Sequence, residues 1–246
     1  LDAKTLNLRV QGADLAVGAL AERAGVKDAA GRGYATGEVT GPFDKPTFSG
    51  RIMLFEPRLD RYDVAAATAR ARLEGDRLAL TDLMATRGAG VVSGDLALGN
   101  LRGPREDVAL DGHLTGEALD LKDVAELLEQ DRPVGGVGEF SAEVSGTVDH
   151  PRATGQLRLV NATYKDFPIA RVEAPFVLED DRLRVAQAQA TILDTPVEAR
   201  GTITFGEKPQ IDAYLTAGDV RLEGLAPYLD TTLSLAGKAS VERVWV

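Results

Sequence analysis

Most of the chain alternates apolar and polar residues with a period of two. The alternation is clearest in residues 92–98, 172–178, 196–205 and 211–217, where small or aliphatic residues occupy every second position. Successive side chains of a β-strand point to opposite faces, so this pattern predicts strands with one apolar and one solvated face. Turn-forming stretches such as FDKP, EGDR, DHP, EDDR and GEKP recur roughly every ten residues and divide the chain into about fifteen strands. Antiparallel meanders are therefore expected.

The chain also contains an internal repeat, which is the strongest signal in the sequence. The segment TGPFDKPTFSG at residues 40–50 matches SGTVDHPRATG at residues 145–155, and LEGDRLAL at residues 73–80 matches LEDDRLRV at residues 178–185. Every match has the same displacement of 105 residues. The sequence predicts two full units followed by a truncated third, with one continuous repeat rod over residues 1–246: about 13–117, about 118–217 and 218–246.

Each unit opens with a short strand and a leucine-rich helical turn, within residues 13–25, 118–130 and 218–230. In the second of these segments, Leu121, Val124, Leu127 and Leu128 fall on one face of a helix. Three short helices are thus expected among the strands.

A repeated antiparallel sheet with an apolar face must bury that face against something. It could close as a sandwich or barrel, or fold lengthwise into a trough. The apolar positions are rich in Ala, Gly, Val and Leu, and aromatic residues make up only 5% of the chain. Such small side chains leave space between facing walls. The expected fold is all-β: a repetitive antiparallel sheet folded lengthwise into a U-shaped groove with short interspersed helices.

Composition narrows the function classes. The chain has 28 basic and 38 acidic side chains and a net charge of −10, with the arginines interspersed among acids, which disfavours a nucleic-acid partner. Cysteine is absent, which excludes thiolate metal sites, disulfides and cysteine catalysis and is compatible with any compartment, including an oxidising periplasm. No apolar stretch approaches the length of a membrane helix, and the chain opens on a strand pattern in place of a signal peptide. Both ends interrupt the repeat, which indicates a segment of a longer protein.

Candidate catalytic and metal-binding residues are few. His113 lies on the polar phase of a strand and His150 in the DHP turn, and neither has nearby histidine or cysteine partners. The glycines of residues 88–94 precede a strand, whereas a nucleotide-binding loop would open a helix, so they are interpreted as hairpin glycines. The carboxylates of residues 179–181 are interpreted as a solvated hairpin tip, although a glycosidase pair or a calcium site could use such groups. The NAT sequon at residues 161–163 fits a glycosylation site, which would mean little if the source were bacterial. We expect no catalytic residue, no metal and no cofactor: the chain is not expected to be an enzyme.

The order of these features resembles a known family. The features are, in chain order, a "D-hydrophobic-x-L-x-x-L" helix, a G-x-G, an alternating strand, "G-x-x-x-x-P-x-x-x-G", and "L-x-x-D-R-L-x-L" before a glycine-punctuated strand. This series resembles the AsmA-like superfamily, and within it TamB, the translocation and assembly module. The resemblance covers the two units and the start of the third. It implies a groove with an apolar interior, in an inner-membrane-anchored protein of the cell envelope that reaches across the periplasm. It also implies transport of phospholipid between the inner and outer membranes, with phospholipid acyl chains and membrane proteins, including a TamA-like barrel, as partners.

The residues expected to line the lipid groove are the period-two apolar positions. They are Val92, Leu96, Leu98, Leu157, Leu159, Val172, Phe176, Leu178, Val197, Ile203, Phe205, Ile211 and Leu215. Two other functions stay open. An assembly scaffold would template outer-membrane β-strands, such as those of autotransporters, along exposed strand edges. A repetitive adhesin or carbohydrate-active solenoid would need exposed aromatics, and Trp245 is the single tryptophan.

Overall fold

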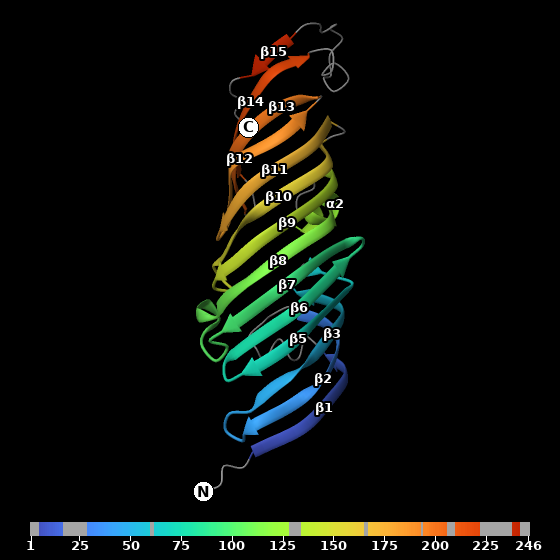
Figure 1. The fold of residues 1–246 in the computed structure, drawn as a ribbon, viewed down its shortest axis with the longest axis vertical. Helices are drawn as coiled ribbons and strands as arrows, with labels where there is room; N and C mark the ends of the chain where they lie inside the picture. The colour runs from blue at the N-terminus through green and yellow to red at the C-terminus, as the bar shows by residue number, and fades with distance from the viewer. Residues whose placement is uncertain are drawn as a thin grey trace. The chain divides into compact units, whose positions relative to one another are not determined.

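The protein is an open, antiparallel β-sheet whose strands follow one another in chain order. The structure, a computed structural model, describes residues 5–16, 29–59, 62–127, 134–164, 167–192, 194–205, 210–221 and 238–241. Hydrogen-bonded neighbours run from β1 to β15 without a crossover, and the two-residue strand β4 lies off this path, paired with β3 (Figure 1). Because β1 and β15 are the two ends of this order, the sheet is not closed on itself. The predicted all-β antiparallel fold with few helices is confirmed.

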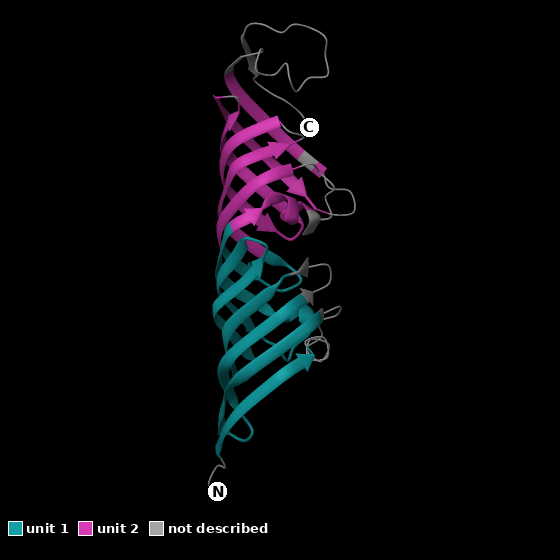
Figure 2. Ribbon diagram, turned by 90° about the vertical axis from the view of Figure 1, so that its right-hand side faces the viewer, with its two compact units in different colours: residues 1–117, 143–151 teal, residues 118–142, 152–246 magenta. Residues whose placement is uncertain are grey.

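The chain divides into two compact units (Figure 2). Unit 1 comprises residues 1–117 and 143–151, and unit 2 comprises residues 118–142 and 152–246. The elements whose main part lies in unit 1 are β1 (Thr5–Ala16), β2 (Ala29–Pro42), β3 (Thr47–Leu59), β4 (Tyr62–Asp63), β5 (Ala66–Glu74), β6 (Arg77–Arg87), β7 (Gly90–Gly99), the 3-10 turn η1 (Arg105–Asp107) and β8 (Ala109–Asp120). Those whose main part lies in unit 2 are α2 (Leu121–Leu127), β9 (Val134–Gly146), β10 (Pro151–Tyr164), β11 (Phe167–Glu179), β12 (Arg182–Ile192), β13 (Thr195–Thr204), β14 (Gln210–Arg221) and β15 (Lys238–Val241).

The 105-residue repeat of the sequence is also a repeat of backbone structure. Strands β6 and β12 have bounds displaced by 105 residues, and so do β7 and β13. Left-handed backbone positions recur at the same displacement: Glu56 and Asn161 have φ values of 47° and 51°, and Gly75 and Asp180 have 65° and 54°. The two units therefore place their bulges and hairpin turns at equivalent positions. The boundaries given above for the repeat units, and their continuity as one rod, stay predictions.

Helix α2 is the described helix among the three that the sequence predicts. Asp120 begins it, because its carboxylate accepts a hydrogen bond from the backbone N–H of Lys122 at 2.8 Å, as N-cap residues do. The helix brings Leu121 against β9 at Gly138, where a Cβ would lie 3.2 Å from a Leu121 methyl carbon. A glycine at this position thus leaves room for the helix. The predicted helices within residues 17–25 and 222–230, and position Leu128 of the second helix, lie outside the described residues.

The predicted turns are found where the period-two pattern breaks. Residues 88–89 form the turn between β6 and β7, so the glycines of residues 88–94 belong to a hairpin, as predicted. Asp180 and Asp181 form the turn between β11 and β12, with Glu179 and Arg182 as the closing pair. In unit 1, the segment that contains η1 is held by an ion pair of 2.7 Å between Arg105 and Asp149.

Candidate functional site

Strand register gathers the apolar residues of unit 1 on one face of its sheet. Opposed residues in antiparallel strands share a face, so a row can be followed from strand to strand. One such row crosses all seven consecutively paired strands of the unit, β1–β3 and β5–β8. Its members are Leu8, Val39, Phe48, Leu73, Leu78, Leu98 and Leu110. We call the face that carries this row the apolar face, and the opposite face the polar face.

Unit 2 has the same arrangement. A row across β10–β14 consists of Leu159, Val172, Ala190, Val197 and Ala217. A second row, on the same face and nearer the β11–β12 turn, consists of Ala153, Leu178, Leu183, Ile203 and Ile211. Each unit therefore has a continuous apolar face built from every second residue of its strands.

All but one of the residues predicted to line the groove occupy apolar-face positions of a described strand. In unit 1 these are Val92, Leu96 and Leu98 of β7, which pair with apolar residues of β6. In unit 2 they are Leu157 and Leu159 of β10, Val172, Phe176 and Leu178 of β11, Val197 and Ile203 of β13, and Ile211 and Leu215 of β14. Phe205 lies just beyond β13, half-buried, and its backbone N–H donates to the Asp181 carbonyl at 2.7 Å. Register brings these positions together within each unit, and their contact with lipid stays a prediction.

The apolar face combines small residues with leucines and other large aliphatic residues, and its buried members are mostly alanines. Val197 is 6% exposed, and five alanines of the same face are also buried: Ala69, Ala71, Ala142, Ala174 and Ala188. Among the described residues no large side chain is fully buried, and Leu8 and Leu73 are 51% and 38% exposed. A globular β-domain fills such a face with interdigitating large side chains. Among the described residues, the large side chains of this face are half-buried or exposed, so this part of the chain does not enclose them in such a core.

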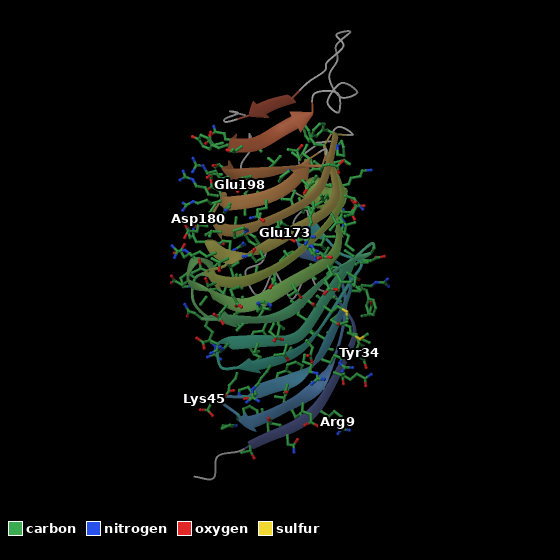
Figure 3. All side chains as sticks on the ribbon, turned by 45° about the horizontal axis from the view of Figure 1, so that its top comes forward. Arg9, Tyr34, Lys45, Glu173, Asp180 and Glu198 are labelled. Carbon is green, nitrogen blue, oxygen red and sulfur yellow. The ribbon has the colours of Figure 1, made fainter. Side chains whose placement is uncertain are left out.

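Most charged and hydroxyl side chains of the strands lie on the polar face, and their pattern differs between the units. Figure 3 draws the side chains on the ribbon, with Tyr34 of unit 1 and Glu173 of unit 2 among those labelled. In unit 2, Arg158 lies between two carboxylates, 3.7 Å from Glu139 and 3.7 Å from Glu173. The row at the equivalent positions of unit 1 carries no charge: Tyr34, Met53, Thr68 and Met84. Met84 is 46% exposed.

The remaining candidate residues lie apart from the apolar face. His113 is on the polar face of β8, as predicted, and its Nδ1 lies 2.9 Å from an oxygen of Glu143. His150 lies in the turn before β10, with its backbone N–H 3.2 Å from the Thr147 hydroxyl oxygen. Within the described residues, no three His, Cys, Asp or Glu side chains are grouped as metal ligands would be. The same part of the chain includes no helix that is long and apolar enough to cross a membrane.

Sequence reasoning missed the polar face as a candidate site. Period-two alternation identifies which residues face away from the apolar side, but only register shows which of them are opposed. The pairing of Arg51 with Arg70 across β3 and β5 is the clearest example, since these residues lie 19 positions apart. No spacing in the sequence marks them as neighbours.

Comparison of the chain with protein families, curated proteins and solved structures finds no match.

Proposed function

We propose that the chain is a lipid-conducting segment of a periplasm-spanning bridge protein, and that phospholipid acyl chains move along its apolar face. The observation that carries this proposal is the continuous apolar face of each unit, on which no large side chain of the described residues is fully buried. The order of the sequence motifs, which resembles that of AsmA-like proteins, supports the same role. In this role the chain acts by binding alone and performs no covalent chemistry.

The dimensions of the apolar face fit an acyl chain. The row in unit 1 crosses seven strands, and six steps of about 4.8 Å make it about 29 Å long. The hydrocarbon core of a bilayer is about 30 Å thick, so the chains of one leaflet extend over about half that distance. One unit can therefore keep a whole acyl chain out of water. Each CH₂ group that is kept out of water lowers the free energy by about 0.8 kcal/mol.

The lining chemistry favours movement over tight capture. A trough of Ala, Gly, Val and Leu offers apolar area without deep pockets, so no position holds a chain much more strongly than the next. Apart from Arg87 at the end of β6, the charged strand residues named above lie on the polar face, and lipid head groups would remain in solvent at the rim of the sheet. Such a surface suits one-dimensional transport between two membranes.

Photocrosslinking in cells tests the proposal. A photoreactive amino acid would replace Ile203 or Leu215 on the apolar face, with Thr202 and Thr216 of the same strands as polar-face controls. Mass spectrometry would then identify the adducts. Because each control is adjacent to its test residue, local mobility and expression are matched, and only the face differs.

The expected outcome is phospholipid adducts at Ile203 and Leu215 and few or none at the two threonines. Adducts with protein alone, or equal lipid labelling on both faces, would overturn lipid conduction. Protein adducts that contain strands of outer-membrane proteins would instead favour the assembly scaffold.

A further inference from the structure

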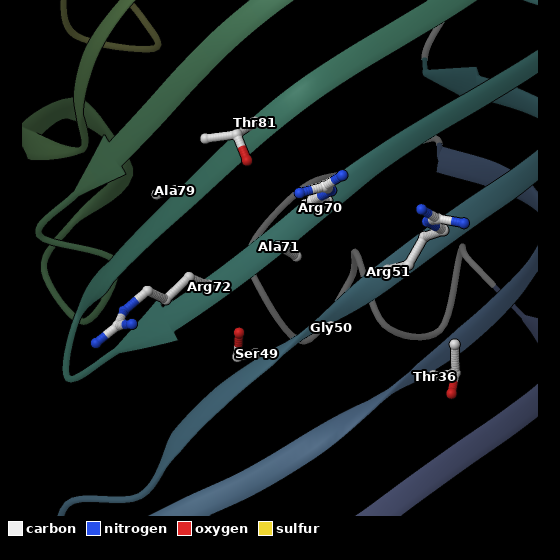
Figure 4. Close-up of a pocket in the computed structure, with 9 residues that line it drawn as sticks. All are labelled: Thr36, Ser49, Gly50, Arg51, Arg70, Ala71, Arg72, Ala79 and Thr81. Carbon is white, nitrogen blue, oxygen red and sulfur yellow. The ribbon is translucent and has the colours of Figure 1, made fainter.

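A cluster of arginines and hydroxyl groups lies on the polar face of unit 1 (Figure 4). Its centre is a cross-strand row of four residues, Thr36 of β2, Arg51 of β3, Arg70 of β5 and Thr81 of β6. In the adjacent row, Ser49 is the register partner of Arg72. These side chains border a hollow of about 530 Å³.

The pairing of Arg51 with Arg70 is unfavourable by itself. Like charges that are directly opposed across an antiparallel pair destabilise the sheet. Asp82 compensates one of them, at 2.9 Å from the Arg70 guanidinium, and Glu74 lies 3.1 Å from Arg72. Arg51 forms no hydrogen bond or ion pair with any residue that the structure describes. Within the described part of the chain, Arg51 is thus an uncompensated positive charge whose register partner is a second arginine.

From this arrangement we propose that the cluster binds a phosphate-type oxyanion between Arg51 and Arg70. Guanidinium groups bind phosphate oxygens through paired N–H donors, and a bound anion replaces the repulsion between the two arginines by attraction to both. The hydroxyls of Thr36 and Thr81, at the two ends of the row, add neutral donors. Ser49 and Arg72 provide further donors on one side of the site.

Unit 2 provides an internal control, because its equivalent positions lack the cluster. Gln156 and Pro175, which are register partners, occupy the positions equivalent to Arg51 and Arg70, and Val177 replaces Arg72. The sheet therefore forms at these positions without any cation. Arginines at this place in unit 1 are not a requirement of the fold, which favours a ligand as the reason for them.

The site is independent of lipid conduction, since it lies on the opposite face of the sheet. Two sources share the required chemistry: free inorganic phosphate and the phosphodiester of a phospholipid head group. Glycerophosphoglycerol, a head group without acyl chains, separates head-group binding from any binding of chains to the apolar face.

The test is a titration of the 246-residue chain with inorganic phosphate and, separately, with glycerophosphoglycerol, at constant ionic strength maintained with sodium chloride. Isothermal calorimetry would measure binding, and urea unfolding would measure stability. The variant Arg51→Gln introduces the residue of unit 2. Arg184→Gln is the matched control, because Arg184 is a polar-face arginine of β12 opposed by Thr202.

At least one of the two ligands should bind saturably, at least tenfold more weakly to Arg51→Gln and equally well to Arg184→Gln. Without ligand, Arg51→Gln should unfold at the same urea concentration as the unmodified chain or a higher one, because the repulsion is removed. Tighter binding of the diester would identify a lipid head group as the source, and tighter binding of phosphate would identify the free ion. Binding that is unchanged in Arg51→Gln, or no binding beyond that of chloride, would overturn the proposal.

Discussion

The two units keep the same apolar face and differ in their polar faces. At equivalent positions, Leu73 and Leu78 of unit 1 correspond to Leu178 and Leu183 of unit 2. On the polar face, the uncharged row that contains Met53 corresponds to the charged row that contains Arg158. The lesson is that every unit needs its apolar face, whereas the polar face is adapted unit by unit. A common function should therefore depend on the apolar face, and any function specific to one unit on the polar face.

The largest effect should come from a glycine that both units keep at the same apolar-face position. A Cβ at Gly155 would lie 2.0 Å from the Ser141 carbonyl oxygen, and one at Gly50 would lie 2.3 Å from that of Thr36. Because backbone atoms cannot move aside cheaply, we expect Gly155→Ala and Gly50→Ala each to destabilise the chain by about 3 kcal/mol, as measured by urea unfolding.

Gly99→Ala is the control for this prediction, since a Cβ there meets only the Cβ of Ala109, at 3.7 Å. Its free energy of unfolding should change by less than about 0.5 kcal/mol. A large loss in only one of Gly50→Ala and Gly155→Ala would break the comparison, because it would show that the two units do not share the same close strand approach.

The next effect concerns the shared apolar face directly. Leu98 and Ala97 are neighbours on β7 with opposite faces, and Leu98 is opposed by Leu78 and Leu110. Leu98→Asp places a charge in the apolar row, so it should lower the free energy of unfolding by about 2 kcal/mol. The variant should also lose most of its binding of a fluorescent acyl-chain probe. Ala97→Asp should leave probe binding unchanged.

Ile203→Asp makes the equivalent change in unit 2, since Ile203 lies 105 positions after Leu98. Equal losses of probe binding in the two variants would sharpen the view that both units perform the same task. Loss in one unit alone would assign acyl-chain binding to that unit and contradict a continuous path.

These comparisons also show what sequence patterns can predict. Alternation placed Leu98, Ile203 and, except for Phe205, the other residues predicted to line the groove on the apolar face of their unit, because the period of a strand is strictly two. It could not reveal bulges such as that at Glu56, since glutamate carries no signal for a left-handed backbone. Alternation also could not pair Arg51 with Arg70, because register depends on bulges and turn lengths as well as on the apolar pattern.

A smaller effect follows from the bulge that the units share. Glu56 and Asn161 occupy equivalent left-handed positions, with φ of 47° and 51°. Asparagine tolerates this conformation, whereas glutamate pays a steric cost of about 1 kcal/mol or more. Glu56→Gly should therefore stabilise the chain by about 0.5–1 kcal/mol in urea unfolding. Glu38→Gly, in the extended part of β2, should destabilise it, and stabilisation by both changes would refute the bulge explanation.

The smallest effect should come from the polar-face row that distinguishes the units. Arg158 lies between Glu139 and Glu173 with both distances at 3.7 Å, and its side chain is 47% exposed. Exposed ion pairs contribute little, so Arg158→Met, which introduces the residue of unit 1, should cost about 0.5 kcal/mol, and this cost should shrink as salt is raised. The reverse change, Met53→Arg, should be nearly neutral, because the residues opposed to Met53, Tyr34 and Thr68, carry no carboxylate. Urea unfolding at low and high salt measures both. A cost above about 2 kcal/mol for Arg158→Met would show that the charged row stabilises unit 2 as the apolar face does, and that the polar faces are not free to diverge.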